Sequence, residues 1–167
     1  MDIAFANDLP VSDPVIISGP DSLNLNGREY LIVSQDDSEK NFYEIRYDVH
    51  CSPFKQAIIA DNVLAVGYEE YFYLFDLSAN TNILRLKMEG YFGHLYTDNG
   101  FFYLADAQGL YKIDKKANLN WHNNNLAIDG VIVTEFTPEK IKGSGEWDPP
   151  GGWRDFILNK ETGIIIN

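Results

Sequence analysis

The chain has only one cysteine, Cys51, among 167 residues, so an internal disulfide is excluded. Residues 1–13 lack the basic region, the apolar region and the cleavage site of a secretory signal. Both features favour a reducing compartment, and we predict a cytoplasmic protein. No apolar run approaches the ~20 residues of a membrane-spanning helix, so we expect no membrane partner.

Basic residues are scarce. The chain has 13 Lys and Arg against 25 Asp and Glu, which gives a formal net charge of −12. A charge of this sign opposes binding to nucleic acid or to an anionic membrane, and it allows a basic protein partner. The alternative interpretation is that the charge only maintains solubility.

Catalytic motifs are also missing. The sequence contains no P-loop, dinucleotide fingerprint, nucleophile elbow or EF-hand loop. His50 and Cys51 are adjacent, but neighbours on a strand point to opposite faces. His94 and His122 lack the spacing of zinc ligands, so we predict no metal site, no cofactor and no enzymatic activity.

Helical apolar spacing is absent beyond two turns, whereas aromatic residues make up 14% of the chain and favour strands. One pattern occurs twice: a turn, an apolar run, a polar loop and an aromatic-rich run. The two copies span residues 61–77 and 98–114, offset by 37 residues at Asp61 and Asp98. Asp76 and Asp114 hold equivalent positions in the two copies, and we expect their carboxylates to bond turn amides.

Similar turn and strand signals on both sides extend the pattern to four units of about four strands each. We therefore predict an all-β fold of antiparallel repeated four-stranded units, propeller-like, since propeller blades have a similar period. The main alternative is a two-sheet β-sandwich. Residues 1–14 are predicted to form an N-terminal arm, with 3–6 as an edge strand, and 15–167 a single β domain.

Alternate connections of an antiparallel meander fall at the same end of the sheet. We expect four acidic loops to converge at that end: 35–40, 67–70, 105–109 and a long loop over 142–152. We assign the turn at Asp129 and Gly130 to the other end. The predicted partner-binding residues are Asp36, Asp37, Glu39, Glu69, Glu70, Asp106, Glu146, Trp147, Asp148 and Trp153. Charged loops are common, so a purely solvating role is the alternative.

The segment Gly145-Glu146-Trp147-Asp148-Pro149-Pro150-Gly151-Gly152-Trp153 is the most unusual of the chain. Tryptophan beside acidic residues on a loop is typical of an interface anchor, or else the rings fold back on the sheet. With Phe156 and Glu161-Thr162-Gly163, this segment resembles the end of small bacterial β-rich proteins, some similar to immunity proteins of contact-dependent growth inhibition and other polymorphic toxin systems. The resemblance covers about twenty residues, and it does not identify any individual binding residue in this sequence.

The resemblance implies an inhibitor that covers the active site of a toxin, often a basic nuclease. We therefore expect a non-enzymatic protein that neutralises a cognate basic protein toxin. A carbohydrate- or small-molecule-binding or hydrolysing protein is the second hypothesis, with Glu69, Glu70, Asp36 and Asp37 as carboxylates. Adjacent carboxylates in one loop do not set a defined gap across a glycosidic bond, which disfavours hydrolysis. A general protein-interaction scaffold is the third hypothesis.

Overall fold

The computed structural model describes residues 1–11, 13–34 and 40–166, and the prediction of an all-β chain is confirmed. One short 3-10 helix, η1 (Pro20–Ser22), interrupts the strands. The first sheet has the order β1-β3-β4-β2, from β1 (Asp2–Ala6), β2 (Val15–Ile16), β3 (Gly27–Ser34) and β4 (Lys40–Tyr47). The second runs in chain order, from β5 (Lys55–Ala60), β6 (Val63–Tyr68), β7 (Tyr71–Asp76) and β8 (Thr81–Lys87).

The third and fourth sheets are also antiparallel meanders. The third contains β9 (Phe92–Asp98), β10 (Phe101–Asp106), β11 (Leu110–Asp114) and β12 (Leu119–Asn123). The fourth contains β13 (Val131–Phe136), β14 (Lys140–Glu146) and β15 (Trp153–Asn159). An isolated bridge between Leu158 and Ile165 brings the C-terminal segment against β15.

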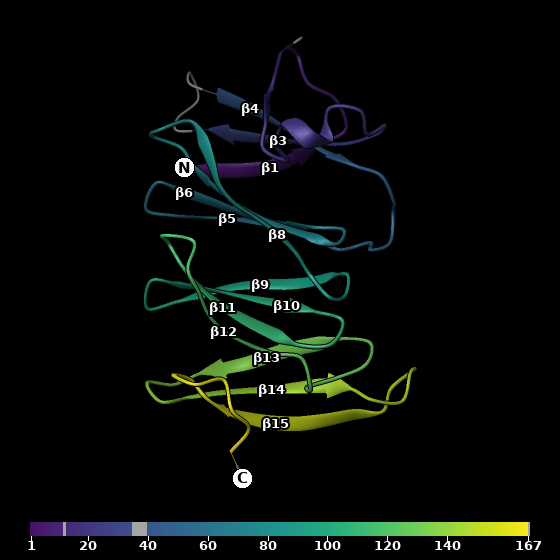
Figure 1. The fold of residues 1–167 in the computed structure, drawn as a ribbon, viewed down its shortest axis with the longest axis vertical. Coiled ribbons are helices and arrows are strands. Elements are labelled where there is room, and N and C mark those ends of the chain that lie inside the picture. Colours follow the sequence, from purple (N-terminus) through teal and green to yellow (C-terminus); the bar gives the residue numbers. More distant parts are fainter. Residues whose placement is uncertain (12, 35–39, 167) are drawn as a thin grey trace.

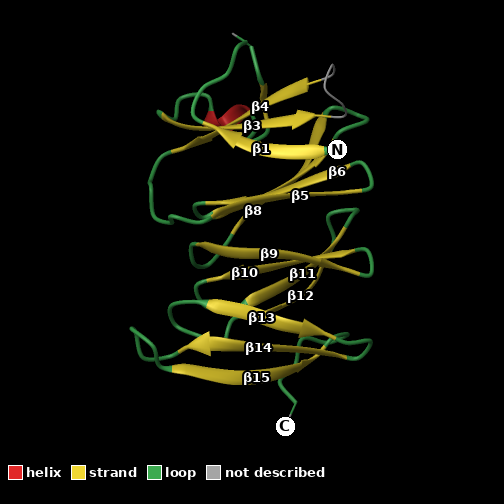
Figure 2. Ribbon diagram, turned by 180° about the vertical axis from the view of Figure 1, so that it is seen from behind, coloured by secondary structure: helices red, strands yellow, loops and turns green. Residues whose placement is uncertain are grey.

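The four sheets stack in a row, and the first and last lie at opposite ends of the molecule in both views (Figures 1 and 2). A separate cluster of buried side chains fills each of the three boundaries. Leu31 and Tyr73 belong to the cluster between the first two sheets. Phe72 and Phe102 meet between the second and third, with ring centroids 6.4 Å apart. The third boundary is filled by the cluster that includes Tyr103, Trp121, Val133 and Leu158.

The repeated pattern corresponds to equivalent turns in the second and third sheets. Asp61 and Asn99 adopt positive φ angles of 54° and 46° in the turns after β5 and β9. Asp76 accepts hydrogen bonds from the amides of Ser78 and Ala79. Asp114 likewise accepts from the amides of Lys116 and Asn118, so the predicted role of both aspartates is confirmed.

Two predicted boundaries are wrong. The expected repeat begins at the turn of residues 98–100, whereas the third sheet begins one strand earlier, with β9. The expected long loop over 142–152 is also shorter, because Lys140–Glu146 is strand β14. Its glycines at 143 and 145 suggest a loop, yet both are buried: Gly143 lies against Ile132 and Phe156 of its own sheet, and Gly145 lies against Leu126 in the connection that precedes β13. The predicted edge strand at 3–6 is present, as β1 paired with β3.

The strand ends define two sides of the stack. One side, on the right in Figure 1, is formed by the connections 48–54, 69–70, 88–91, 107–109, 124–130 and 147–152, and we call it the acidic side. The opposite side is formed by the turns 61–62, 77–80, 99–100, 115–118 and 137–139. Asp129 lies on the acidic side, and its predicted assignment to the other end is wrong. The Asp-Gly dipeptide joins two sheets and does not close a hairpin.

Candidate functional site

The six connections of the acidic side contain no lysine or arginine. They carry exposed or partly exposed acids instead: Asp48, Glu70, Glu89, Asp129 and Asp148. The opposite side is more balanced, because the turn at 115–118 alone contributes Lys115 and Lys116. The negative charge of the loops is therefore concentrated on one side of the stack.

The predicted site residues that the structure describes lie on the acidic side: Glu69, Glu70, Asp106, Glu146, Trp147, Asp148 and Trp153. Asp36, Asp37 and Glu39 lie outside the described residues. Val33 and Asn41, on the strands that flank them, line a hollow with Leu77 and Asn80. Those two strand ends thus belong to the opposite side, not to the side of Glu69.

Glu69 is a structural residue. Its side chain is 3% exposed and accepts hydrogen bonds from the amides of Cys51 and Ser52 at 2.6 and 3.0 Å. The imidazole of His50 lies 2.5 Å from the other carboxylate oxygen. These contacts tie the 48–54 connection, which joins the first two sheets, to the second sheet. Glu69 is therefore not available to a partner.

The environment of Glu69 predicts a pH-dependent contribution to stability. Burial by itself raises the pKa of this carboxyl, but the hydrogen bonds from Cys51, His50 and Ser52 outweigh burial and lower the pKa below its usual 4.5. A lowered pKa stabilises the fold above pH 4.5, and the stabilisation is lost as the pH falls through the folded-state value. We expect Glu69→Gln to lower the free energy of unfolding by about 1–3 kcal/mol at pH 7. The difference in free energy of unfolding between wild type and variant should become smaller below pH 4.5. Urea unfolding at several pH values measures this difference; a gap independent of pH would contradict it.

Asp106 has the same role one repeat later and is fully buried. Its carboxylate accepts hydrogen bonds from the amides of Gly90, Gln108 and Gly109 and from the Tyr111 hydroxyl, at 2.7–3.1 Å. Gly90 belongs to the 88–91 connection, which joins the second and third sheets. Asp106 therefore fixes that connection and, like Glu69, presents no carboxylate to a partner.

Neither Cys51 nor the histidines have the environment of a nucleophilic pair. Burial and the nearby carboxylates of Glu69 and Glu70 raise the pKa of the Cys51 thiol to about 11. The thiolate, which is the reactive form, is thus disfavoured at neutral pH. Burial lowers the pKa of His94 and His122. Among the described residues, no three His, Cys, Asp or Glu side chains are grouped so that they could hold a metal ion.

Asp48, Glu89 and Asp129 are not among the partner-binding residues predicted from the sequence. All three lie in connections between sheets. The sequence shows only a polar break at Asp48 and Glu89, and at Asp129 the Asp-Gly dipeptide suggests a hairpin turn that does not form. With the correct boundaries of the four sheets, these three residues could have been predicted from the sequence. Each of them lies in a connection that is attached to a strand end on the acidic side.

Exposed apolar side chains lie among these acids near the fourth sheet. Ile128 is 52% exposed and Trp153 is 42% exposed. The two come together because the Ile128 amide bonds the Glu146 carbonyl at 2.9 Å, and Glu146 pairs with Trp153 in the sheet. We call Glu89, Ile128, Asp129, Asp148 and Trp153 the acidic patch.

Hydrogen bonds from neighbouring elements hold two acids of the patch, Asp129 and Glu89. The Tyr91 hydroxyl donates to Asp129 at 2.7 Å, and the Asn124 amide donates to Glu89 at 2.9 Å. Trp147 is partly buried, with the Arg154 guanidinium 5.7 Å from its ring centre. The patch therefore combines fixed carboxylates with exposed apolar surface, as the rim and centre of protein interfaces do.

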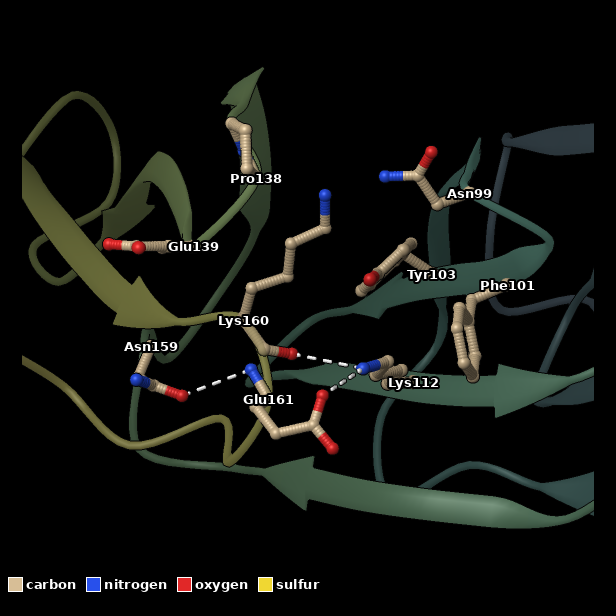
Figure 3. A pocket seen from close by; sticks show the side chains of 9 residues that line it. All are labelled: Asn99, Phe101, Tyr103, Lys112, Pro138, Glu139, Asn159, Lys160 and Glu161. Carbon is tan, nitrogen blue, oxygen red and sulfur yellow. Dashed lines mark hydrogen bonds and ion pairs between the residues drawn. The ribbon is translucent and has the colours of Figure 1, made fainter.

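On the opposite side, a hollow of about 330 Å³ lies between the third and fourth sheets (Figure 3). It is lined by Asn99, Phe101, Tyr103, Lys112, Pro138, Glu139, Asn159, Lys160 and Glu161. Lys112 and Lys160 are only 4% and 6% exposed. Buried lysines are rare unless they are paired, so this hollow is a second candidate site.

No protein family model matches the sequence, and no curated protein shows significant similarity to it. In the described part of the chain, no helix has the length and apolar character needed to cross a membrane.

Proposed function

We propose that this chain is a non-enzymatic immunity-type protein that binds a cognate basic protein toxin through the acidic side and covers the toxin's active site. The observation that carries the proposal is the acidic patch, in which Ile128 and Trp153 are exposed among Glu89, Asp129 and Asp148. A basic partner supplies the opposite charge, and the apolar side chains supply the contact area.

The mechanism is occlusion. Carboxylates of the patch pair with lysine and arginine side chains that otherwise hold the phosphates of the toxin's substrate. Trp153 inserts as the apolar anchor, because exposed tryptophans dominate the binding energy of many interfaces. Fixed acids around it steer the approach of the toxin and accelerate association at low salt.

We also propose that the fold is propeller-like. Each sheet is interpreted as one propeller-like blade in an open row, and the second and third sheets support this best because both are four-stranded meanders. An open row leaves the connections of one side accessible along its whole length, which suits a binding scaffold.

Co-expression tests the function. The protein is produced with the product of the reading frame directly beside its gene, which we expect to be a basic toxin, and growth and affinity are measured. Wild type should restore growth. The triple variant Glu89→Lys, Asp129→Lys and Asp148→Lys should bind about tenfold more weakly or worse, because like charges then face each other.

A matched variant on the opposite side controls for net charge. Asp61→Lys, Glu139→Lys and Glu161→Lys changes the net charge by the same amount at exposed positions and should retain binding. An equal loss of affinity in both variants would show that binding depends on the overall charge of the protein and not on the acidic patch. A neighbouring product that is neither basic nor bound would contradict the toxin itself.

A further inference from the structure

The hollow between the third and fourth sheets contains hydrogen-bond donors that have no acceptor within the described part of the chain. The Lys112 ammonium donates to the Lys160 carbonyl at 3.2 Å and to the Glu161 carboxylate at 3.4 Å. The Lys160 ammonium donates to the Thr137 carbonyl at 2.7 Å and pairs with Asp98. Each ammonium has three N–H donors, so each retains one donor beyond these contacts.

Tyr103 supplies a further unused donor. Its side chain is fully buried, and its hydroxyl has no hydrogen-bond partner among the described residues. Burial raises the pKa of this phenol, so the hydroxyl stays protonated and can donate. A buried polar group without a partner is costly and uncommon in folded proteins, which makes an absent acceptor the natural explanation.

The lysines are held in place by more than their hydrogen bonds. The Lys112 ammonium lies 4.3 Å from the Phe101 ring centre, and the Lys160 ammonium lies 5.7 Å from that of Phe136. Figure 3 shows Lys160 extending toward the hollow from the fourth sheet, with Tyr103 and Lys112 reaching it from the third. Donors from two sheets therefore converge on one space.

Asp98, which pairs with Lys160, is the inner acid of this region, and the two acids that line the hollow itself are at its mouth. Glu139 is exposed. The Glu161 side chain is 89% exposed, and among the described residues its carboxylate makes only the long contact to Lys112. A carboxylate so weakly held can be displaced by another oxyanion, which would then accept from Lys112, Lys160 and Tyr103 together.

We propose that this hollow is a binding site for a small oxyanion, the carboxylate or phosphate group of a small molecule, which displaces Glu161 and accepts hydrogen bonds from Lys112, Lys160 and Tyr103. The site lies on the side of the stack opposite the acidic patch, so it is independent of toxin binding. The floor of the site recognises the oxyanion, and the partly exposed ring of Phe101 contacts the rest of the ligand.

Calorimetric titration with inorganic phosphate and with succinate, at constant ionic strength, tests the proposal on the full chain. We expect saturable binding of at least one of them, and the tighter probe identifies the group. Tyr103→Phe removes only the hydroxyl and should weaken binding about tenfold or more. Glu161→Gln should tighten binding, because it removes the competing charge.

The melting temperature provides the control. Tyr103→Phe should melt at or above the wild-type temperature without ligand, because it removes an unpaired buried group. Tyr111→Phe on the adjacent strand should melt lower and keep ligand affinity, because the Tyr111 hydroxyl already bonds Asp106. Absence of saturable binding for both probes, or unchanged affinity in Tyr103→Phe, would overturn the proposal.

Discussion

Asp106→Ala should destabilise the protein by about 3 kcal/mol or more, because it leaves several buried donors without an acceptor. The donors are the amides of Gly90, Gln108 and Gly109 and the Tyr111 hydroxyl. For a chain of this length, the melting temperature should fall by roughly 6–12 °C. Differential scanning calorimetry measures the change.

The matched control is Asp148→Ala. Asp148 is also an acid of the acidic side, but it is exposed, so its loss should change stability by less than about 0.5 kcal/mol. Comparing the two variants distinguishes acids that stabilise the fold from exposed acids that can bind a partner. Similar melting temperatures for the two variants would show that Asp106 does not fix the 88–91 connection.

Gly145→Ala is expected to be the most disruptive glycine substitution. A methyl group on this residue would lie 1.8 Å from the Leu126 carbonyl oxygen, which is backbone and cannot rotate away. The 124–130 connection would have to move off β14, and overpacking of this kind costs about 3 kcal/mol or more when backbone must shift. Because Ile128 and Asp129 belong to the same connection, partner affinity should fall with stability.

Gly93→Ala is the comparison for Gly145→Ala. Its methyl group would meet only the Ala105 carbonyl oxygen at 3.3 Å, so a much smaller loss of stability is expected. Urea unfolding measures both variants, and hydrogen exchange reports whether 124–130 is loosened. A Gly145→Ala variant as stable as Gly93→Ala would show that the close contact with Leu126 does not exist in solution.

The sequence supports the all-β fold because turn residues and aromatic runs are local signals. The turn at Asp61 needs a positive φ angle, and Asp76 bonds the amides that follow it, so both can be identified without knowing the rest of the structure. The order of sheets along the row is set instead by contacts between distant segments. Hydrophobic patterning shows that Phe72 and Phe102 are buried, but not that they meet.

The acidic side also shows that sequence patterns do not reveal contacts between distant segments. Glu69 and Asp106 lie at the same end of corresponding strands, β6 and β10, and both hold the connection that precedes their own sheet. The acids that lie at this end of the two strands are therefore structural. Asp129 and Glu89 recur less regularly and remain exposed, because connections between sheets vary more than the hairpins within them. Only the packing of the sheets distinguishes the two groups.

Hydrogen exchange on the complex with the basic partner tests the central claim most directly. Binding at the acidic side predicts slower amide exchange at 88–91, 124–130 and 147–152, and unchanged exchange at the turns 61–62, 77–80 and 115–118. Slower exchange confined to those turns, with the acidic side unchanged, would contradict the account.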